Sequence, residues 1–442
     1  MSAQPVLSRR TVPPPSPHPT SKAPKRTWRA IRVTGFFSLL CLLPIVLSAA
    51  ILLFCPPVLE AMSAMFVKPE PGLIAWNGHD RITLVAMGLT QRTTEPARTD
   101  TLMVMDVDPS RRHISIMSVP RDLWVDIPGY GQGKLAIAYE IGGPKLAAYT
   151  LERALGIPVD YTLALTFRGF TKIVNAMGGV TVDVPVELKD PTYPCLVGYD
   201  YCPIDIKPGV QHMDGATALE FVRERHAFSQ QDLARVKDQQ AFSDAAKRTL
   251  LSPTTWPRFP AIIRALEGSL ITNLPLNDAP AIGAQYVLTP KQNVDHEYIN
   301  IENGLVQSSW SNDGQSILVP SNSTDIPNLI HRLFGDPTLA KENASVAVLN
   351  GTNTPGEASD VQGTLQGLGF HATTVGNADN SSYAHCQVIV NTAVPGSVDY
   401  TARRLQRILN ASLVYRKLPG QSAQIVAIVG NDFPGQASSS SQ

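Results

Sequence analysis

The first 32 residues of the chain contain no aspartate or glutamate, although they contain seven arginines and lysines. Over the whole 442 residues, basic and acidic side chains are equal in number at 37 each. The chain after residue 32 therefore carries 30 basic and 37 acidic groups, a net charge of −7. An acidic surface repels phosphate backbones and no segment resembles a nucleic-acid-binding module, so we expect no nucleic-acid partner.

Three catalytic signatures are missing. The chain has no G-x-S-x-G elbow and no H-E-x-x-H motif, and its glycine-rich segment from Gly129 to Lys134 lacks the Walker spacing and the following serine or threonine. These absences argue against an α/β-hydrolase, a zinc protease of that type and a P-loop nucleotide site. The glycine-rich segment is interpreted as a flexible loop.

Long apolar runs are scarce, and one segment is the exception. Val33 to Phe54 holds 22 residues without a charge, enough for the ~20 that a membrane-spanning helix needs. Basic residues precede this run and Glu60 follows it, so the positive-inside rule places the N-terminus in the cytoplasm and residues after about 60 outside the cell membrane. A cleaved signal peptide is the alternative, but the run is longer than a usual signal core and no clear cleavage site follows. We expect residues 1–32 to be a disordered cytoplasmic segment and residues 33–54 to be a single transmembrane helix.

Cysteine is rare, with five in the chain. Cys41 and Cys55 lie in or beside the apolar run, whereas Cys195 and Cys202 bracket a short loop that contains proline and glycine. Outside the membrane such a loop predicts a disulfide, because a metal site would need further cysteines or histidines at ligand spacing. Cys386 is then left unpaired, and we expect it to be buried.

After the apolar run, strand-like and helix-like patterns alternate, which is typical of a central sheet covered by helices. The predicted strands are Ile82 to Met87, Thr101 to Val107, His113 to Val119 and Tyr161 to Phe167. The predicted helices are Pro144 to Leu155, Arg168 to Met177, Asp214 to Phe221 with Asp214 as N-cap, and Asp232 to Leu250.

A second domain is expected because the chain is longer than one typical domain. A domain boundary is predicted at Pro327, Gly335, Asp336 and Pro337. Beyond it the pattern predicts a small βαββαβ domain of ferredoxin-like type. Its predicted elements are Val346 to Leu349, Gly356 to Leu368, Ala372 to Val375, Gln387 to Val390, Asp399 to Leu409 and Gln424 to Val429. The serine-rich tail at 434–442 is expected to be disordered.

Polar side chains that suit an anion gather in four short stretches. They are Arg98-Thr99-Asp100, Arg121-Asp122, Arg223-Glu224-Arg225, and the segment from Asp232 through Arg235 to Gln239. A guanidinium is a planar fork for phosphate oxygens, and several with few balancing carboxylates predict a polyanionic ligand. Asp100 and Arg121 flank predicted strands, so one rim of the sheet can present both.

Each pair taken alone has a simpler interpretation. Asp100 can cap a turn, Arg121 can pair with Asp122 at the surface, and Arg235 with Gln239 can belong to a solvated helix face. The recurrence of arginine beside an oxygen-bearing side chain, rather than any single pair, favours a binding site.

The order of these motifs resembles the LytR-CpsA-Psr (LCP) family. The resemblance rests on RTDTLMVMDVDP, SVPRDLWVDIPG, YTLALTFRGFTKIVNAMGGVTVDVP, QHMDGATALEFVRERH and DLARVKDQQ, and it runs continuously over about residues 79–255. A later stretch, VAVLNGTNTPGEASDVQGTLQGLGF with AIVGNDF, resembles the LytR C-terminal domain that is often appended to that family.

The resemblance implies an α/β/α sandwich with a central mixed sheet over residues 79–335 and a LytR C-terminal-like domain over residues 344–433. It implies a membrane-anchored, extracytoplasmic phosphotransferase. Such an enzyme moves a glycopolymer from a polyprenyl-pyrophosphate carrier onto peptidoglycan or another cell-wall glycan, and its pocket holds the lipid.

The resemblance also assigns roles by motif position. Mg²⁺ is the implied cofactor, with Asp100 helping to hold it. Asp100 and Arg121 are the implied catalytic residues. The implied pyrophosphate-binding residues are Arg121, Arg223, Arg225, Arg235 and Gln239.

The chain departs from the family pattern at three places. Thr90 stands where a Gly-x-Asp turn usually has its aspartate, Asp238 stands where an arginine commonly precedes the glutamine, and Lys134-Leu135-Ala136 replaces a usual Lys-Ile-Asn. One carboxylate fewer lowers the expected affinity for Mg²⁺, although Mg²⁺ often uses one or two carboxylates with substrate phosphates and water. The alternative is a non-catalytic protein that binds polyprenyl pyrophosphate or acts as a cell-wall scaffold.

Overall fold

The structure is a computed structural model that describes residues 73–90, 96–195, 200–223, 231–275, 277–394 and 397–433, with the backbone alone at 231–240. The predicted cytoplasmic segment, the predicted span at 33–54 and the predicted tail at 434–442 lie outside these ranges. Within the described ranges, no helix has the length and apolar character that crossing a bilayer requires.

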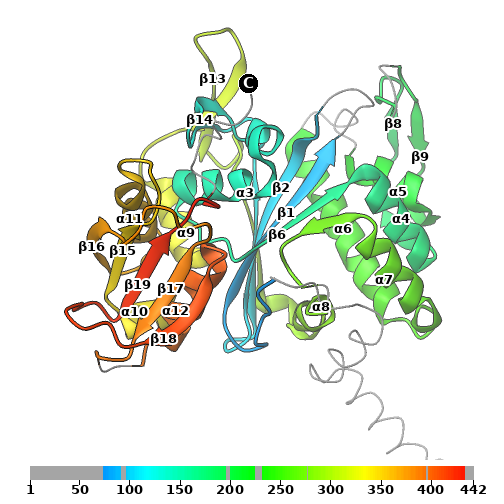
Figure 1. The fold of residues 1–442 in the computed structure, drawn as a ribbon. Helices are drawn as coiled ribbons and strands as arrows, with labels where there is room; N and C mark the ends of the chain where they lie inside the picture. The colour runs from blue at the N-terminus through cyan, green and yellow to red at the C-terminus, as the bar shows by residue number, and fades with distance from the viewer. Residues whose placement is uncertain are drawn as a thin grey trace, which may run out of the picture. The chain divides into compact units, whose positions relative to one another are not determined.

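A six-stranded mixed sheet, in the order β11-β6-β1-β2-β3-β12, forms the centre of the first domain (Figure 1). β1 is antiparallel to β2 and parallel to β6, while β3 is antiparallel to β2 and parallel to β12. The four predicted strands are confirmed, and the short edge strands β11 and β12 are additional because their sequences lack a long apolar run. The bounds are β1 Ile82–Thr90, β2 Arg98–Asp108, β3 His113–Val119, β6 Tyr161–Thr166, β11 Leu270–Thr272 and β12 Val294–Tyr298.

Helices cover both faces of this sheet, because alternate residues of a strand point to opposite faces. Val85 and Met87 of β1 pack with α3 (Leu135–Leu155) and α9 (Asp325–Phe334), whereas Leu84 packs with α8 (Ala279–Leu288). A further apolar cluster joins four helices to the strand β7, and Figure 1 shows it on the side of the sheet away from α3. Its elements are α4 Phe167–Met177, α5 Gly215–Arg223, α6 Gln231–Leu251, α7 Phe259–Glu267 and β7 Val180–Val184. The domain is the α/β/α sandwich that the sequence predicts.

Two local predictions need correction. Helix α3 begins at Leu135 rather than Pro144, because two helical stretches meet at Gly142 and Gly143, where Gly143 has a positive φ of 64°. The glycine-rich segment is not a free loop, because Gly131–Lys134 forms β5, which pairs with β4 (Trp124–Ile127) in a hairpin. The N-cap prediction for α5 is confirmed, since Asp214 Oδ1 accepts a hydrogen bond of 2.9 Å from the Thr217 amide.

Smaller elements complete the first domain. Three two-stranded sheets besides the β4–β5 hairpin pair β7 with β10, β8 with β9, and β13 with β14. Their bounds, with those of two 3₁₀ turns, are β8 Leu188–Asp190, β9 Ile204–Ile206, β10 Gly209–Met213, β13 Val306–Trp310, β14 Ser316–Pro320, η1 Trp256–Arg258 and η2 Lys291–Asn293.

The second domain holds a five-stranded sheet in the order β16-β15-β19-β17-β18. The predicted βαββαβ elements are all present, with one further strand, β18, between α12 and β19. The arrangement is not ferredoxin-like, because β15 and β16 are direct parallel neighbours, as are β17 and β18, so neither βαβ unit is split. The bounds are α10 Pro337–Glu342, β15 Val346–Asn350, α11 Glu357–Gly367, β16 Ala372–Asn377, β17 Gln387–Asn391, α12 Asp399–Ile408, β18 Ser412–Arg416 and β19 Ile425–Val429.

Arginine side chains of helix α12 contact the first domain at the edge of its sheet where β1 and β6 begin. Arg404 is fully buried, and its Nη atoms lie 3.1 Å from Asp336 Oδ2 and 3.6 Å from Asp160 Oδ2. Arg407 donates from Nε to Asp160 Oδ1 at 2.9 Å. We call the full set of four arginines and four aspartates the junction cluster; it comprises Arg81, Arg403, Arg404, Arg407, Asp80, Asp106, Asp160 and Asp336. Its formal charges cancel.

Arg404→Met should lower the free energy of unfolding by about 3–5 kcal/mol, because it removes the arginine that pairs with the buried Asp336 and one of the two that pair with Asp160. Urea titration of the full chain in detergent measures this loss. Arg416→Met is the matched control, since Arg416 is exposed on β18 and a surface change there should stay within about 0.5 kcal/mol. Equal effects of the two substitutions would show that the junction cluster contributes nothing.

Glu152 of α3 is expected to make the stability of the fold depend on pH. The side chain is buried, its Oε1 accepts from the Val159 amide at 2.9 Å, and burial together with the nearby Asp160 charge raises its pKa to about 8. A carboxyl with a raised folded-state pKa stabilises the fold below its unfolded pKa of about 4.3, and that stability is lost as pH rises through about 8.

Glu152→Gln keeps the acceptor oxygen and cannot ionise, so the variant should exceed the parent in unfolding free energy by roughly 3–4 kcal/mol at pH 9 and show little difference at pH 5. Urea titrations at both pH values measure the difference. Exposed Glu302→Gln is the control. A gap of the same size at pH 5 and pH 9 would contradict the assignment.

Candidate functional site

One rim of the central sheet collects the predicted polar residues. β1 ends at Thr90, β2 begins at Arg98, β3 ends at Val119 and β6 ends at Thr166. The pairing of Leu89 with both Thr99 and Thr166, and that of Leu102 with Val119, place these ends side by side. We call this edge the polar rim; it lies at the opposite ends of the strands from the junction cluster.

Arg121 follows β3 at the polar rim and contacts two carboxylates. It forms ion pairs with Asp100 of β2 and, through Nε at 3.3 Å, with Asp122 Oδ2. Lys134 Nζ lies 3.1 Å from Asp122 Oδ1. The Asp100 side chain is 11% exposed and the Arg121 side chain 40%, so Arg121 can reach a ligand from solvent while Asp100 anchors it. The structure thus brings the two predicted catalytic residues together.

Arg223, the last residue of α5, is held by aromatic rings rather than by a carboxylate. Its guanidinium carbon lies 4.0 Å from the centre of the Phe167 ring and 5.5 Å from that of Tyr193, and Nη1 donates to the Tyr193 hydroxyl at 3.1 Å. Its Nε is buried and has no hydrogen-bond partner within the described structure. Ring faces attract a cation without cancelling its charge, so this guanidinium stays available to an anion.

Arg121 and Arg223 both lie at the polar rim. The position of Arg223 is given by Phe167, whose ring it contacts. Phe167 directly follows β6, and Arg121 follows β3 at a distance of two residues. The strands β6, β1, β2 and β3 are consecutive neighbours, so three spacings of ~4.8 Å separate the two positions by roughly 14 Å. If the side chains of Arg121 and Arg223 extend toward each other across this distance, both can bind one multiply charged anion.

The remaining predicted ligands are only partly located. Arg225 lies outside the described residues. Arg235 and Gln239 belong to α6, whose backbone is described at these positions and whose side chains are not. Their predicted role in pyrophosphate binding therefore stays a prediction.

Asp100 and Asp122 are the carboxylates of the polar rim that could share a magnesium ion with a substrate, and each also contacts Arg121. The two carboxylates therefore lie within reach of one another. No group of three or more His, Cys, Asp or Glu residues forms a metal cage within the described ranges. One or two carboxylates that share the ion with substrate phosphates and water is the pattern typical of Mg²⁺.

Sequence reasoning missed the aromatic support of Arg223. Tyr193 lies beside the loop that Cys195 and Cys202 close; these two residues are joined by a disulfide with Cα atoms 4.9 Å apart. The Cys202 amide donates to the Tyr193 carbonyl at 2.8 Å, so the closed loop fixes the backbone that carries the ring. The sequence signal was an aromatic residue at the end of a predicted strand, Phe167, and another two residues before a predicted disulfide cysteine, Tyr193. Cys386, by contrast, is buried and free.

Comparison with known proteins covers most of the described chain. A model of the LytR_cpsA_psr family matches residues 63–324, and a model described as LytR cell envelope-related transcriptional attenuator matches residues 343–433.

Three kinds of curated relative align with parts of the chain. Regulatory protein MsrR of Staphylococcus aureus is 29% identical over 55% of this chain and 72% of its own length. Probable cell wall biosynthesis protein LcpB of Corynebacterium glutamicum is 38% identical over 38% of this chain and 39% of its own length. The polyisoprenyl-teichoic acid–peptidoglycan teichoic acid transferase TagU of Enterococcus faecalis is 31% identical over 43% of this chain and 60% of its own length.

Solved structures show more distant similarity. The crystal structure of B. subtilis TagV is 22% identical and covers 58% of this chain and 97% of that chain, with a TM-score of 0.47. A structure of TagT bound to LIIa-WTA is 24% identical and covers 61% of this chain and 97% of that chain, with a TM-score of 0.44.

Phe167→Leu should weaken the binding of inorganic pyrophosphate about 3- to 10-fold, because it removes the ring face that positions the Arg223 guanidinium. Calorimetric titration of the full chain in detergent with Mg²⁺ present measures the affinity. Phe170→Leu is the matched control: Phe170 lies on the same helix and packs against Phe242 instead. If both variants bind like the parent, Phe167 has no part in the site.

Proposed function

We propose a function from one established premise: the chain belongs to the LytR_cpsA_psr family, whose model matches residues 63–324. One similar protein is named as a teichoic acid transferase to peptidoglycan and another as a cell wall biosynthesis protein, which at the level of the family supports transfer of a cell-wall glycopolymer. More finely, we propose that this chain is an extracytoplasmic phosphotransferase that takes the glycopolymer from a polyprenyl-pyrophosphate carrier.

The unpaired cation of Arg223 is the observation that carries this proposal. A guanidinium that is partly buried, stacked on two rings and unbonded at Nε has a cost of desolvation that no described carboxylate offsets. A diphosphate would supply the missing charge and the missing acceptor. Arg121 at the same rim would hold the neighbouring phosphate oxygens.

The reaction needs positioning and charge neutralisation more than covalent chemistry. A hydroxyl of the acceptor glycan attacks the phosphorus that carries the sugar, a new phosphoester bond forms, and the P–O bond of the anhydride breaks so that polyprenyl phosphate leaves. Arg223 and Arg121 hold the phosphate oxygens where negative charge grows. Asp100 accepts the proton of the attacking hydroxyl. If another base accepts that proton, the role of Asp100 is to orient Arg121.

Mg²⁺, held by Asp100 with Asp122 nearby, would neutralise phosphate charge when it is bound. Asp100 also forms an ion pair with Arg121, so a bound ion would share this carboxylate with the guanidinium. Thr90 contributes a neutral group at the end of β1, next to Arg98 across the strand pair. The chain therefore relies more on arginine, and less on carboxylates, than the family pattern with aspartate at this turn.

The apolar run at 33–54 would anchor the chain in the cell membrane with both folded domains on the outer side. This placement suits the proposed reaction, because a polyprenyl carrier keeps its tail in the bilayer and its acceptor, peptidoglycan or another cell-wall glycan, lies outside the cell.

The alternative function belongs to another class. In it the chain has kept a polyprenyl-pyrophosphate site and lost turnover, and it acts as a non-catalytic binding or scaffold protein of the cell wall. The residues that favour this alternative are Thr90 at the polar rim and Asp238, which take the places of an aspartate and an arginine in the family pattern.

Arg121→Ala and Arg223→Ala should each abolish transfer, with losses of at least 100-fold, because each removes a cation that the transition state needs. The assay combines the full chain in detergent with Mg²⁺ and a polyprenyl-pyrophosphate-linked glycan, and it follows polyprenyl phosphate release and glycan attachment. Arg264→Ala, on the exposed side of α7, is the matched control.

The same assay separates the two functions. If the parent protein binds the donor tightly and releases no polyprenyl phosphate, the binding or scaffold function is correct. Parent protein that transfers glycan, with both arginine variants equally active, would place the reaction outside the polar rim.

A further inference from the structure

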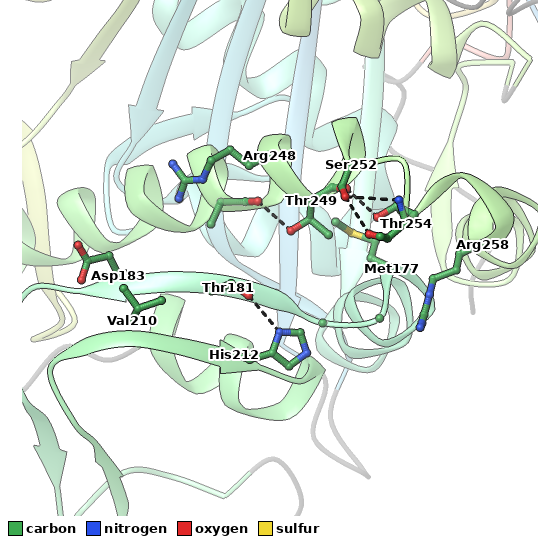
Figure 2. A pocket seen from close by; sticks show the side chains of 14 residues that line it. Met177, Thr181, Asp183, Val210, His212, Arg248, Thr249, Ser252, Thr254 and Arg258 are labelled. Carbon is green, nitrogen blue, oxygen red and sulfur yellow. Dashed lines mark hydrogen bonds between the residues drawn. The ribbon is translucent and has the colours of Figure 1, made fainter. Parts of the chain in front are cut away.

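A cavity lies away from the polar rim, at the other end of α4. It encloses about 500 Å³ between the end of α4, the strands β7 and β10, the end of α6 and the turn that follows it (Figure 2). This volume falls in the range of small-ligand sites. Its polar lining includes Arg248, Arg258, His212, Asp183, Ser252 and Thr254.

The cavity holds positive charge without a counter-ion. Within the described structure, neither Arg248 nor Arg258 forms an ion pair or a side-chain hydrogen bond, and both are exposed. Asp183 is the acidic residue of the lining, and it lies on β7 four residues beyond Gly179, ~13 Å along the strand. Figure 2 likewise shows Asp183 and Arg258 at opposite ends of the cavity. The Arg258 end is therefore an anion-binding environment.

Gly178 and Gly179 line the Arg258 end of the cavity. Gly178 and Gly179 both have positive φ, 91° and 87°. A Cβ atom on Gly178 would collide with the Arg258 guanidinium, and one on Gly179 would collide with the His212 ring. The absence of side chains thus lets the guanidinium and the imidazole lie against adjacent residues of the backbone. His212 is further oriented by a 3.1 Å hydrogen bond between its Nδ1 and Thr181 Oγ1.

Hydroxyl groups line the rest of this end. Ser252 Oγ and Thr254 Oγ1 lie 2.8 Å apart in the turn after α6, and Figure 2 shows them between the α6 end and Arg258. Exposed hydroxyls that bond to each other can exchange partners with a ligand at small cost. A row of hydroxyls beside a guanidinium suits a sugar that bears a phosphate.

We propose that this cavity binds a phosphorylated saccharide, with the phosphate at Arg258 and His212 and the sugar hydroxyls on Ser252 and Thr254. Arg248 adds attraction from the other wall. The site is separate from the polar rim, because α4 has 11 residues and spans ~16 Å between Phe167 and Met177. The proposal requires binding alone and does not depend on the transfer reaction.

The test uses calorimetric titration of the full chain in detergent with α-glucose 1-phosphate. The double variant Arg121→Ala/Arg223→Ala serves as background, so that the polar rim does not contribute. Binding should persist in this background and fall at least 10-fold when Arg258→Ala is added. Arg264→Ala, a matched change of an exposed arginine on α7, should leave the affinity unchanged. Asp183→Asn should strengthen binding or leave it equal.

Glucose and inorganic phosphate distinguish the chemistry of the ligand. Glucose should bind at least 10-fold more weakly than glucose 1-phosphate, and so should phosphate. Phosphate that binds as tightly as glucose 1-phosphate would reduce the cavity to an anion site and overturn the saccharide assignment. No binding in the background variant, or an unchanged affinity after Arg258→Ala, would overturn the site itself. Thermal denaturation of each variant confirms that it is folded.

Discussion

The junction cluster is the constraint on which the arrangement of the two domains depends. Four arginines and four aspartates meet where β1 and β6 begin, and the Arg404 and Asp160 side chains are fully buried. Ions removed from water cost several kcal/mol each, and their mutual attraction returns that energy only when partners are placed well. Helix α12 must therefore dock in one position, with Arg407 and Arg404 both facing Asp160. Because buried ion pairs add little net stability, we expect the cluster to contribute specificity of docking more than stability.

Strand direction explains why the chemistry lies at the opposite rim. β1 and β6 both start near the junction cluster and end at the polar rim, while β2 starts at the polar rim. The interiors of these strands are filled by apolar side chains packed on both faces, so charged groups are accommodated at the strand ends. One end holds balanced charges that join two domains. The other holds arginines that are only partly balanced, and that imbalance is what a diphosphate would correct.

Helix α4 connects the polar rim with the cavity for which we propose a second anion site. Its first residue, Phe167, supports Arg223, and its last turn leads into Gly178 and Gly179, which support Arg258 and His212. In both places the cation rests on an uncharged surface, a ring face in one and bare backbone in the other. A support of this kind positions the cation and leaves its charge for a ligand.

Local sequence patterns were sufficient to predict most of the elements and to suggest the candidate chemistry. Short apolar runs predicted β1, β2, β3 and β6, and proline and glycine predicted the domain boundary region. The recurrence of arginine beside oxygen-bearing side chains predicted a polyanion site. Periodicity could not foresee β18 or the pairing of the second sheet, because register depends on partners that are distant in the chain. Sequence patterns also could not separate the roles of similar arginines. Arg404 is buried and pairs with the buried Asp160, Arg121 pairs with Asp100 at the polar rim, and Arg223 lies against the Phe167 ring. Only the tertiary structure decided these roles, since an arginine's charge is cancelled or left available by the residues that folding brings next to it.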